Sequence, residues 1–222
     1  MSTISHHPGD DLIGLYAAGS LEHGWSLAIA SHLSLCPECR ERLAAAEAAG
    51  GALLEALPAQ APVDAAWNAL HRRLLHPAPL PPQQAATPAP APSGAGPFLP
   101  APLRRAVGGD LESLRWRPLG LGAYHLPIAT HDGTSVRLLR IPAGRPVPEH
   151  AHRGRELTLV LCGAFADATG HYARGDLQDA DTDLQHQPVA DADIDCICLA
   201  VTDAPLRFRS WMVRAVQPLL GI

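Results

Sequence analysis

The sequence lacks the features of three large classes of protein. It has no apolar run of about 18 residues, the length that a transmembrane helix needs. Its first segment, Met1 to Gly9, carries two histidines and no basic-then-apolar signal pattern, so a cytoplasmic location is expected. The net charge of −5 is not typical of a nucleic-acid-binding domain, which needs a basic face. We therefore expect no membrane and no direct contact with nucleic acid.

Lysine is absent and cysteine is scarce. All 17 basic residues are arginine, which we attribute to genomic base composition and not to function. An odd number of cysteines in a cytoplasmic chain argues against a framework of disulfides. The close spacing of two pairs instead favours metal binding or redox chemistry. The five cysteines are Cys36, Cys39, Cys162, Cys196 and Cys198.

A proline-rich stretch divides the chain. Residues 77–102 hold ten of the 22 prolines and no charged residue. Proline at this density cannot continue a helix or a central strand, and it is typical of an extended tether. We therefore predict a linker at 77–103 between one domain of residues 1–76 and another of residues 104–222. The first is the more acidic, with eight acidic and four basic residues against 14 and 13 after the linker.

The first domain has the apolar periodicity of α-helices. Four are predicted: Asp10 or Asp11 to about Ala18, Glu22 to Leu35, Pro37 to Gly50 or Leu57, and Val63 to Leu75. On the fourth, Trp67 is interpreted as a core anchor, with contact to a partner as the alternative. A domain of this size has a small core and often needs a metal or disulfide to stabilise it.

The second domain has the pattern of short β-strands. Residues 136–141, 157–161 and 194–200 are rich in apolar and β-branched side chains and are separated by Gly, Pro and Asp clusters. Many short strands in so few residues predict a β-barrel or jelly roll. The predicted fold is therefore multi-domain, helices first and strands after.

The strongest short motif of the helical domain is His-x3-Cys-x2-Cys, formed by His32, Cys36 and Cys39. An imidazole at the end of one helix and two thiolates at the start of the next can converge on one tetrahedral ion, and this soft donor set suits zinc. A closed site needs a fourth ligand, and both His6 and His7 lie upstream. The alternative interpretation is a redox pair or two buried thiols.

This arrangement resembles the zinc-binding anti-sigma domain. In that family the motif and an upstream histidine hold zinc in a four-helix fold that binds sigma factors of the extracytoplasmic-function group. Segments 17–21 and 31–36 are similar to the ChrR-type members in particular, as are 156–161, 195–200, 202–208 and 216–220. The spacing in those members implies that His7, and not His6, is the fourth ligand.

A second motif lies between Gly144 and Gly163. These residues fit G-x5-H-x-H-x3-E-x6-G at every position, the first motif of the cupin family, so the predicted barrel is a cupin. Residues two apart on a strand point to the same side, so His150 and His152 both face the barrel interior. Glu156 returns on the next strand.

His186 is the third histidine expected of a cupin. It follows a Gly-Asp step at 175–176, although the usual Pro-x-Gly turn is replaced by Asp-Thr-Asp at 181–183. His150, His152, Glu156 and His186 are together predicted to bind Zn²⁺ or another divalent transition metal. A barrel that has lost its metal is the alternative.

The two resemblances together imply an anti-sigma factor. One chain would hold one extracytoplasmic-function sigma factor through the zinc-bound helical domain. The cupin would release it in oxidative stress such as that caused by singlet oxygen. No catalytic residue is assigned. The alternatives are a dioxygenase-like metal enzyme, since such a ligand set is catalytically competent, and a cupin that binds a small metabolite.

Overall fold

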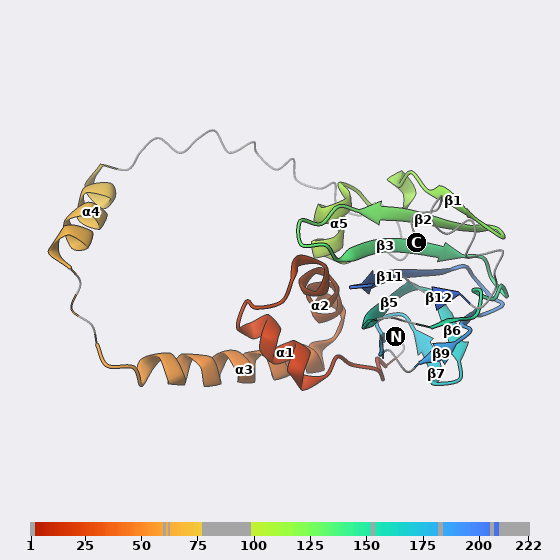
Figure 1. The fold of residues 1–222 in the computed structure, drawn as a ribbon, viewed down its shortest axis with the longest axis horizontal. Coiled ribbons are helices and arrows are strands. Elements are labelled where there is room, and N and C mark those ends of the chain that lie inside the picture. The colour runs from red at the N-terminus through yellow and green to blue at the C-terminus, as the bar shows by residue number, and fades with distance from the viewer. Residues whose placement is uncertain are drawn as a thin grey trace. The chain divides into compact units, whose positions relative to one another are not determined.

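The computed structural model describes residues 3–59, 61, 63–76, 99–151, 154–181 and 184–204, and the backbone of 207–208. Five α-helices are found in these residues, and all but the last precede the proline-rich segment (Figure 1). They are α1 (Asp10–Ala17), α2 (His23–Leu35), α3 (Pro37–Glu55), α4 (Asp64–Leu75) and α5 (Ala101–Val107), and a 3₁₀ turn follows at Leu111–Ser113. No helix in this part of the chain combines the length and the apolar character that a bilayer crossing requires.

Local sequence explains where the first helices begin and end. After α1, Gly19 adopts a left-handed φ of 65°, which a residue with a side chain rarely does, and this ends the helix. Pro37 occupies the first position of α3, where its missing N–H has no partner to lose. Helices α1 to α4 therefore lie close to their predicted positions.

Helix α5 was not predicted. Residues 101–103 were assigned to the linker, but Ala101 begins this helix and Leu99 and Leu103 are fully buried. The predicted linker of 77–103 is thus too long at its C-terminal end, because proline is tolerated in the first turn of a helix as well as in a tether. The remainder of that segment, 77–98, lies outside the described residues.

The strands of the described residues all pair antiparallel. Among the described residues they form a six-stranded sheet, in the order β1-β2-β3-β11-β5-β8, and two three-stranded sheets, β10-β6-β7 and β12-β4-β9. The predicted strands correspond to β3, β5 and β11, which lie side by side in the large sheet. The strands are β1 (Arg117–Gly120), β2 (Ala123–Ile128), β3 (Ser135–Ile141), β4 (His150–Ala151), β5 (Glu156–Cys162), β6 (Ala164–Asp167), β7 (Gly170–Ala173), β8 (Leu177–Ala180), β9 (Gln185–His186), β10 (Val189–Ala190), β11 (Cys196–Thr202) and β12 (Arg207–Phe208).

One hydrophobic core joins the helices to the large sheet. Ile29 of α2 and Leu103 of α5 belong to the same buried cluster as Leu157 and Leu159 of β5 and Leu199 of β11. Helices α2 and α5 accordingly lie on one side of the sheet in Figure 1. The contacts divide the chain into one unit of Met1–Glu47 with Pro97–Ile222 and a second of Ala48–Gly96, so the predicted boundary at residue 76 does not coincide with a unit boundary.

The second unit contains the end of α3 and all of α4. No residue of α4 is buried, and Trp67 is 52% exposed. The interpretation of Trp67 as a core anchor is therefore wrong, because the helices that build the core are α1, α2, the start of α3 and α5. Among the described residues of this unit, the large apolar side chains are exposed: Leu53, Leu54, Leu57, Val63, Trp67, Leu70, Leu74 and Leu75.

Candidate metal centres

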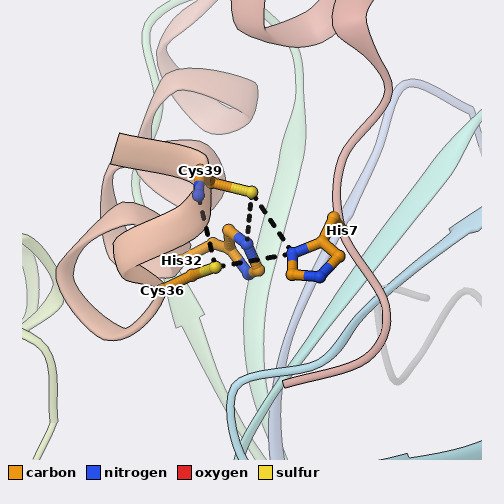
Figure 2. Close-up of side chains that lie close together, drawn as sticks. All are labelled: His7, His32, Cys36 and Cys39. Atoms are coloured by element: carbon orange, nitrogen blue, oxygen red, sulfur yellow. Dashed lines mark hydrogen bonds between the residues drawn. The ribbon is translucent and has the colours of Figure 1, made fainter. Parts of the chain in front are cut away.

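Four side chains of the helical region converge on one point, which we call the His–Cys centre. Figure 2 shows His7 on the extended N-terminal segment, facing His32 of α2, Cys36 between the helices and Cys39 in the first turn of α3. One potential ligand atom from each lies within 4.8 Å of all the others. The structure thus brings together the four residues of the first predicted site.

The separations fit a tetrahedral ion. The Nδ1 of His7 lies 3.4 Å from the Sγ of Cys36 and 3.3 Å from the Sγ of Cys39. The Nε2 of His32 lies 3.2 Å from the Sγ of Cys39. Around a zinc ion with Zn–S near ~2.3 Å and Zn–N near ~2.0 Å, a nitrogen and a sulfur ligand stand about 3.5 Å apart. This His–Cys set is therefore suited to zinc.

Burial shifts the pKa of two of these side chains. It lowers the pKa of His32 to about 4, so the imidazole is neutral at physiological pH. Burial, together with the neighbouring Cys36, raises the pKa of Cys39 to about 12. A thiolate at this depth is stable only beside positive charge, which a divalent cation would supply.

Both imidazoles of the centre are oriented through their second nitrogen. The Nδ1 of His32 donates a hydrogen bond of 2.9 Å to the carbonyl of Gly175, which turns Nε2 toward Cys39. The Nε2 of His7 lies 3.5 Å from a carboxylate oxygen of Glu38. Such outer contacts fix the tautomer and ring orientation of a metal-ligating histidine.

The segment that carries His7 is held by the β-rich half. The Oδ1 of Asp176 accepts backbone N–H bonds of 2.7 Å from Ser5 and 2.9 Å from His6. The backbone N–H of Leu177 donates to the carbonyl of His6 at 3.1 Å. The position of His7 therefore depends on the turn between β7 and β8.

His6 is directed away from the centre. Its ring centroid lies 4.3 Å from that of Tyr172, and its Nδ1 is 3.6 Å from the Oδ2 of Asp176. Of the two upstream histidines, the structure places His7 against the cysteines.

The second predicted set lies in the β-rich half, and we call it the His–Glu centre. His150 on β4 and His186 on β9 are register partners, and their Nε2 atoms are 3.1 Å apart. Glu156 is buried at the start of β5, where its Oε1 accepts a hydrogen bond of 3.0 Å from Thr158. Within the described residues the His–Cys centre is the one group of three or more metal-binding side chains, so the structure brings His150 and His186 together but does not join Glu156 to them. The fourth residue of the prediction, His152, lies outside the described residues.

His150 and His186 face each other through their Nε2 atoms, because the Nδ1 atom of each is held by another group. The Nδ1 of His150 is 2.8 Å from the carbonyl of Pro148, which can only accept, so this nitrogen carries the proton. The Nδ1 of His186 is 2.6 Å from the carboxylate of Asp167 and donates in the same way. The two Nε2 atoms, which lie 3.1 Å apart, are then the ring nitrogens left to bind a cation.

Burial also sets the charges of this centre. It lowers the pKa of His150 to about 4, so the ring is neutral at physiological pH. It raises the pKa of Glu156 to about 7, an effect that the hydrogen bond from Thr158 opposes. A carboxyl group with such a pKa is divided between its neutral and charged forms near pH 7.

Asp167 at the end of β6 belongs to the site and was not predicted. Its side chain is 0% exposed. Burial alone would raise its pKa, but hydrogen bonds from Thr169, Gln178 and His186 outweigh burial and lower it to about 2. The carboxylate is thus ionised and orients His186. In the sequence it stands in Asp-Ala-Thr-Gly, typical of a turn, and nothing there indicates a role beside a metal ligand.

Known proteins share both halves of this fold. Residues 104–205 match a family described as the ChrR cupin-like domain. The chain is 47% identical over 220 residues to the anti-sigma-E factor ChrR of Cereibacter sphaeroides (strain ATCC 17023). The aligned region covers 99% of this chain and 100% of that relative. It is also similar to a chain in the crystal structure of Rhodobacter sphaeroides SigE in complex with the anti-sigma ChrR, with a TM-score of 0.74 and 43% identity. That match covers 90% of this chain and 100% of the other.

Proposed function

This chain belongs to the ChrR family of anti-sigma factors, and on that premise we propose that it binds an extracytoplasmic-function sigma factor and keeps it from RNA polymerase. The resemblance predicted from the sequence and the fold class, helices followed by a cupin-like domain, are thereby confirmed. We propose a complex of one chain of each protein.

The observation that carries the proposal is the uncovered apolar side of α4. Trp67, Leu70 and Leu74 recur at helical spacing and are 52%, 48% and 67% exposed. An amphipathic helix with such a stripe is the form in which many helices enter a groove of a partner protein. Leu53, Leu54 and Leu57, at and just beyond the end of α3, are exposed as well and extend the apolar surface of this unit.

Charge supports the same partner. The helical region, residues 1–76, carries eight acidic and four basic residues. The surfaces of a sigma factor that face DNA are expected to be basic, so complementary potentials would favour their encounter. The sigma factor would then be occluded from polymerase while the complex lasts.

A binding assay with the purified sigma factor tests this function. Replacing Trp67 by Ala is expected to weaken binding by about 2 kcal/mol or more, roughly 30-fold, because large aromatic anchors dominate such interfaces. Asn68→Ala is the matched control, since Asn68 is an exposed polar neighbour on the same helix. Equal binding by wild type and Trp67→Ala would contradict the proposed surface.

Metal at the His–Cys centre would fix the helical region in its binding shape. We assign zinc there, with His7, His32, Cys36 and Cys39 as ligands. A closed site with two sulfur ligands contributes stability and leaves no position open for a substrate. This role is consistent with the buried, mutually oriented side chains of the centre.

The His–Glu centre would decide when the sigma factor is released. We assign His150, His152, Glu156 and His186 as ligands of Zn²⁺ or another divalent transition metal. We propose that it responds to oxidants such as singlet oxygen and does not turn over a substrate. Support comes from similarity over the whole length of a relative that is named as an anti-sigma factor.

A reporter gene driven by the sigma factor separates sensing from catalysis. If the centre senses, Glu156→Ala should still inhibit transcription in resting cells but fail to release the sigma factor after oxidant. If the centre is an enzyme of the dioxygenase kind, the variant would lose turnover of a small substrate and show normal induction. Normal induction in Glu156→Ala removes the sensing role.

A further inference from the structure

We infer that strand β8 and the turn before it couple the two metal centres. In the turn, Gly175 accepts a hydrogen bond from His32 of the His–Cys centre, and Asp176 accepts one from the backbone next to His7. On the strand, Gln178 donates a hydrogen bond to Asp167, the carboxylate that orients His186 of the His–Glu centre. This inference rests on the proposed function, because it assumes that both centres hold metal in the working protein.

The turn holds both histidine ligands of the His–Cys centre. The carbonyl of Gly175 accepts the Nδ1–H of His32 at 2.9 Å. The carboxylate of Asp176, which is 2% exposed, accepts the backbone N–H of His6 at 2.9 Å and so positions the adjacent His7. A displacement of this turn therefore moves two ligands, one from each side of the centre.

The strand reaches the other centre through one side chain. The amide nitrogen of Gln178 donates to the Oδ2 of Asp167 at 2.8 Å and to the hydroxyl of Thr169 at 2.9 Å. The same Oδ2 accepts the Nδ1–H of His186 at 2.6 Å. A single carboxylate oxygen is thus shared between a predicted metal ligand and β8.

The link is short and stiff. Gln178 stands two residues after Asp176, about 7 Å along an extended strand. The turn is tied to β5, where Val160 accepts from the N–H of Gly175 at 2.9 Å and donates to the carbonyl of Asp176 at 3.0 Å. Gln178 is also the register partner of Thr158, whose hydroxyl donates to Glu156. Changes at His186 or Glu156 therefore reach the turn through packed, hydrogen-bonded groups.

Cobalt gives a signal that is specific to one centre. Co²⁺ bound by thiolates absorbs strongly by charge transfer, which ligation by histidine and carboxylate does not produce. The full-length chain is loaded with Co²⁺, a chelator is added in excess, and the rate at which the thiolate band disappears is measured. The assay is run on wild type and His186→Ala, each alone and combined with Gln178→Met.

Coupling predicts a result that is not additive. His186→Ala should change the rate of cobalt release from the His–Cys centre by at least about fivefold in the wild-type background. In the Gln178→Met background the same substitution should change it by less than about twofold. Gln185→Met is the matched control, since Gln185 is an exposed neighbour of His186 whose amide donates to Glu149 and not to Asp167; the full effect should persist there.

Two outcomes overturn the inference. One is an unchanged release rate in His186→Ala, and the other is a full effect that survives Gln178→Met. Should a variant fail to fold, amide hydrogen exchange on the wild type replaces it. A second equivalent of Zn²⁺, added to fill the His–Glu centre of a chain that already holds one Zn²⁺ at the His–Cys centre, should alter exchange at Leu177 and His6. Unaltered exchange refutes the coupling. Neither assay uses a sigma factor, so failure of partner binding and failure of coupling are read separately.

Discussion

The two candidate metal centres differ in what surrounds the ion. The His–Cys centre offers two sulfurs and two nitrogens, and its imidazoles are oriented by the carbonyl of Gly175 and by Glu38. The His–Glu centre offers imidazole nitrogens and the carboxyl oxygens of Glu156, whose pKa burial raises to about 7. The ionised Asp167 orients His186 there. The first set has the donor atoms that suit zinc, whereas the second contains a carboxyl group whose pKa lies near physiological pH.

The largest expected effect tests whether the His–Cys centre is structural. Cys39→Ser should lose the zinc of this centre and partner binding together, because structural zinc contributes on the order of 10 kcal/mol in small zinc modules. Metal analysis and a sigma-factor binding assay measure the two losses. Cys162→Ser, a thiol outside both predicted ligand sets, should retain both. Full zinc in Cys39→Ser would refute the ligand assignment.

The next effect tests whether the two centres have separate roles. His150→Ala removes a predicted ligand. It should therefore weaken metal binding at the His–Glu centre by more than the roughly 10–100-fold that follows loss of a residue hydrogen-bonded to a ligand. The chain should nevertheless remain loaded with zinc at the His–Cys centre, because a severalfold change leaves a tight site full. Metal content and resting inhibition check this. Loss of both metals in His150→Ala would show one cooperative site in place of two.

A smaller effect tests the dependence of the His–Cys centre on the β-rich half. Asp176→Ala removes the acceptor for the N–H groups of Ser5 and His6 and should weaken zinc binding by about tenfold. Competition with a chromophoric chelator measures the affinity. Asp193→Ala, at an exposed carboxylate in a turn, is the control and should bind zinc as wild type does. Equal affinities in both variants would mean that the helical region holds its metal unaided.

The smallest effect concerns the ion pair between Asp11 of α1 and Arg155, the residue before β5. Arg155 contacts Asp11 at 2.8 Å and also pairs with Asp179, but Asp11 is 56% exposed. Asp11→Asn should therefore lower the free energy of unfolding by no more than about 1 kcal/mol.

Its pH dependence has a defined sign. The hydrogen bond from Arg155 lowers the pKa of folded Asp11 below its ordinary value of 3.8. The stabilisation is thus present above pH 3.8 and is lost as the pH falls through the lower, folded value. Urea unfolding should separate wild type from Asp11→Asn at neutral pH, and the gap should close in acid. A gap that widens in acid would contradict the assignment.

Much of the local structure was predictable from the sequence. Helices α1 to α4 follow apolar periodicity and end at Gly or Pro signals, and β3, β5 and β11 are the runs richest in apolar and β-branched residues. His32, Cys36 and Cys39 stand within eight residues of one another, so their convergence follows from helix geometry alone. For His7 the resemblance to a family was needed, because nothing local distinguishes it from His6.

Long-range contacts were not predictable. The apolar face of α2 indicates that the helix is buried, but not that Ile29 packs in one core with Leu157 and Leu199. The acceptor for His32 is a backbone carbonyl, which every residue possesses, so no side chain marks Gly175. Asp167 resembles any aspartate in a turn until the fold places it beside His186.

The bond between His32 and Gly175 also has a consequence for biosynthesis. The two residues are 143 positions apart, so a ribosome that has made all four metal-binding residues of the helical region still has most of the message to translate before the acceptor emerges. Contacts of such separation form late, after the intervening chain has collapsed. If a nascent chain binds zinc early, His32 therefore lacks its hydrogen-bond acceptor at that stage. The orientation of His32 can be completed only after the turn between β7 and β8 has been translated.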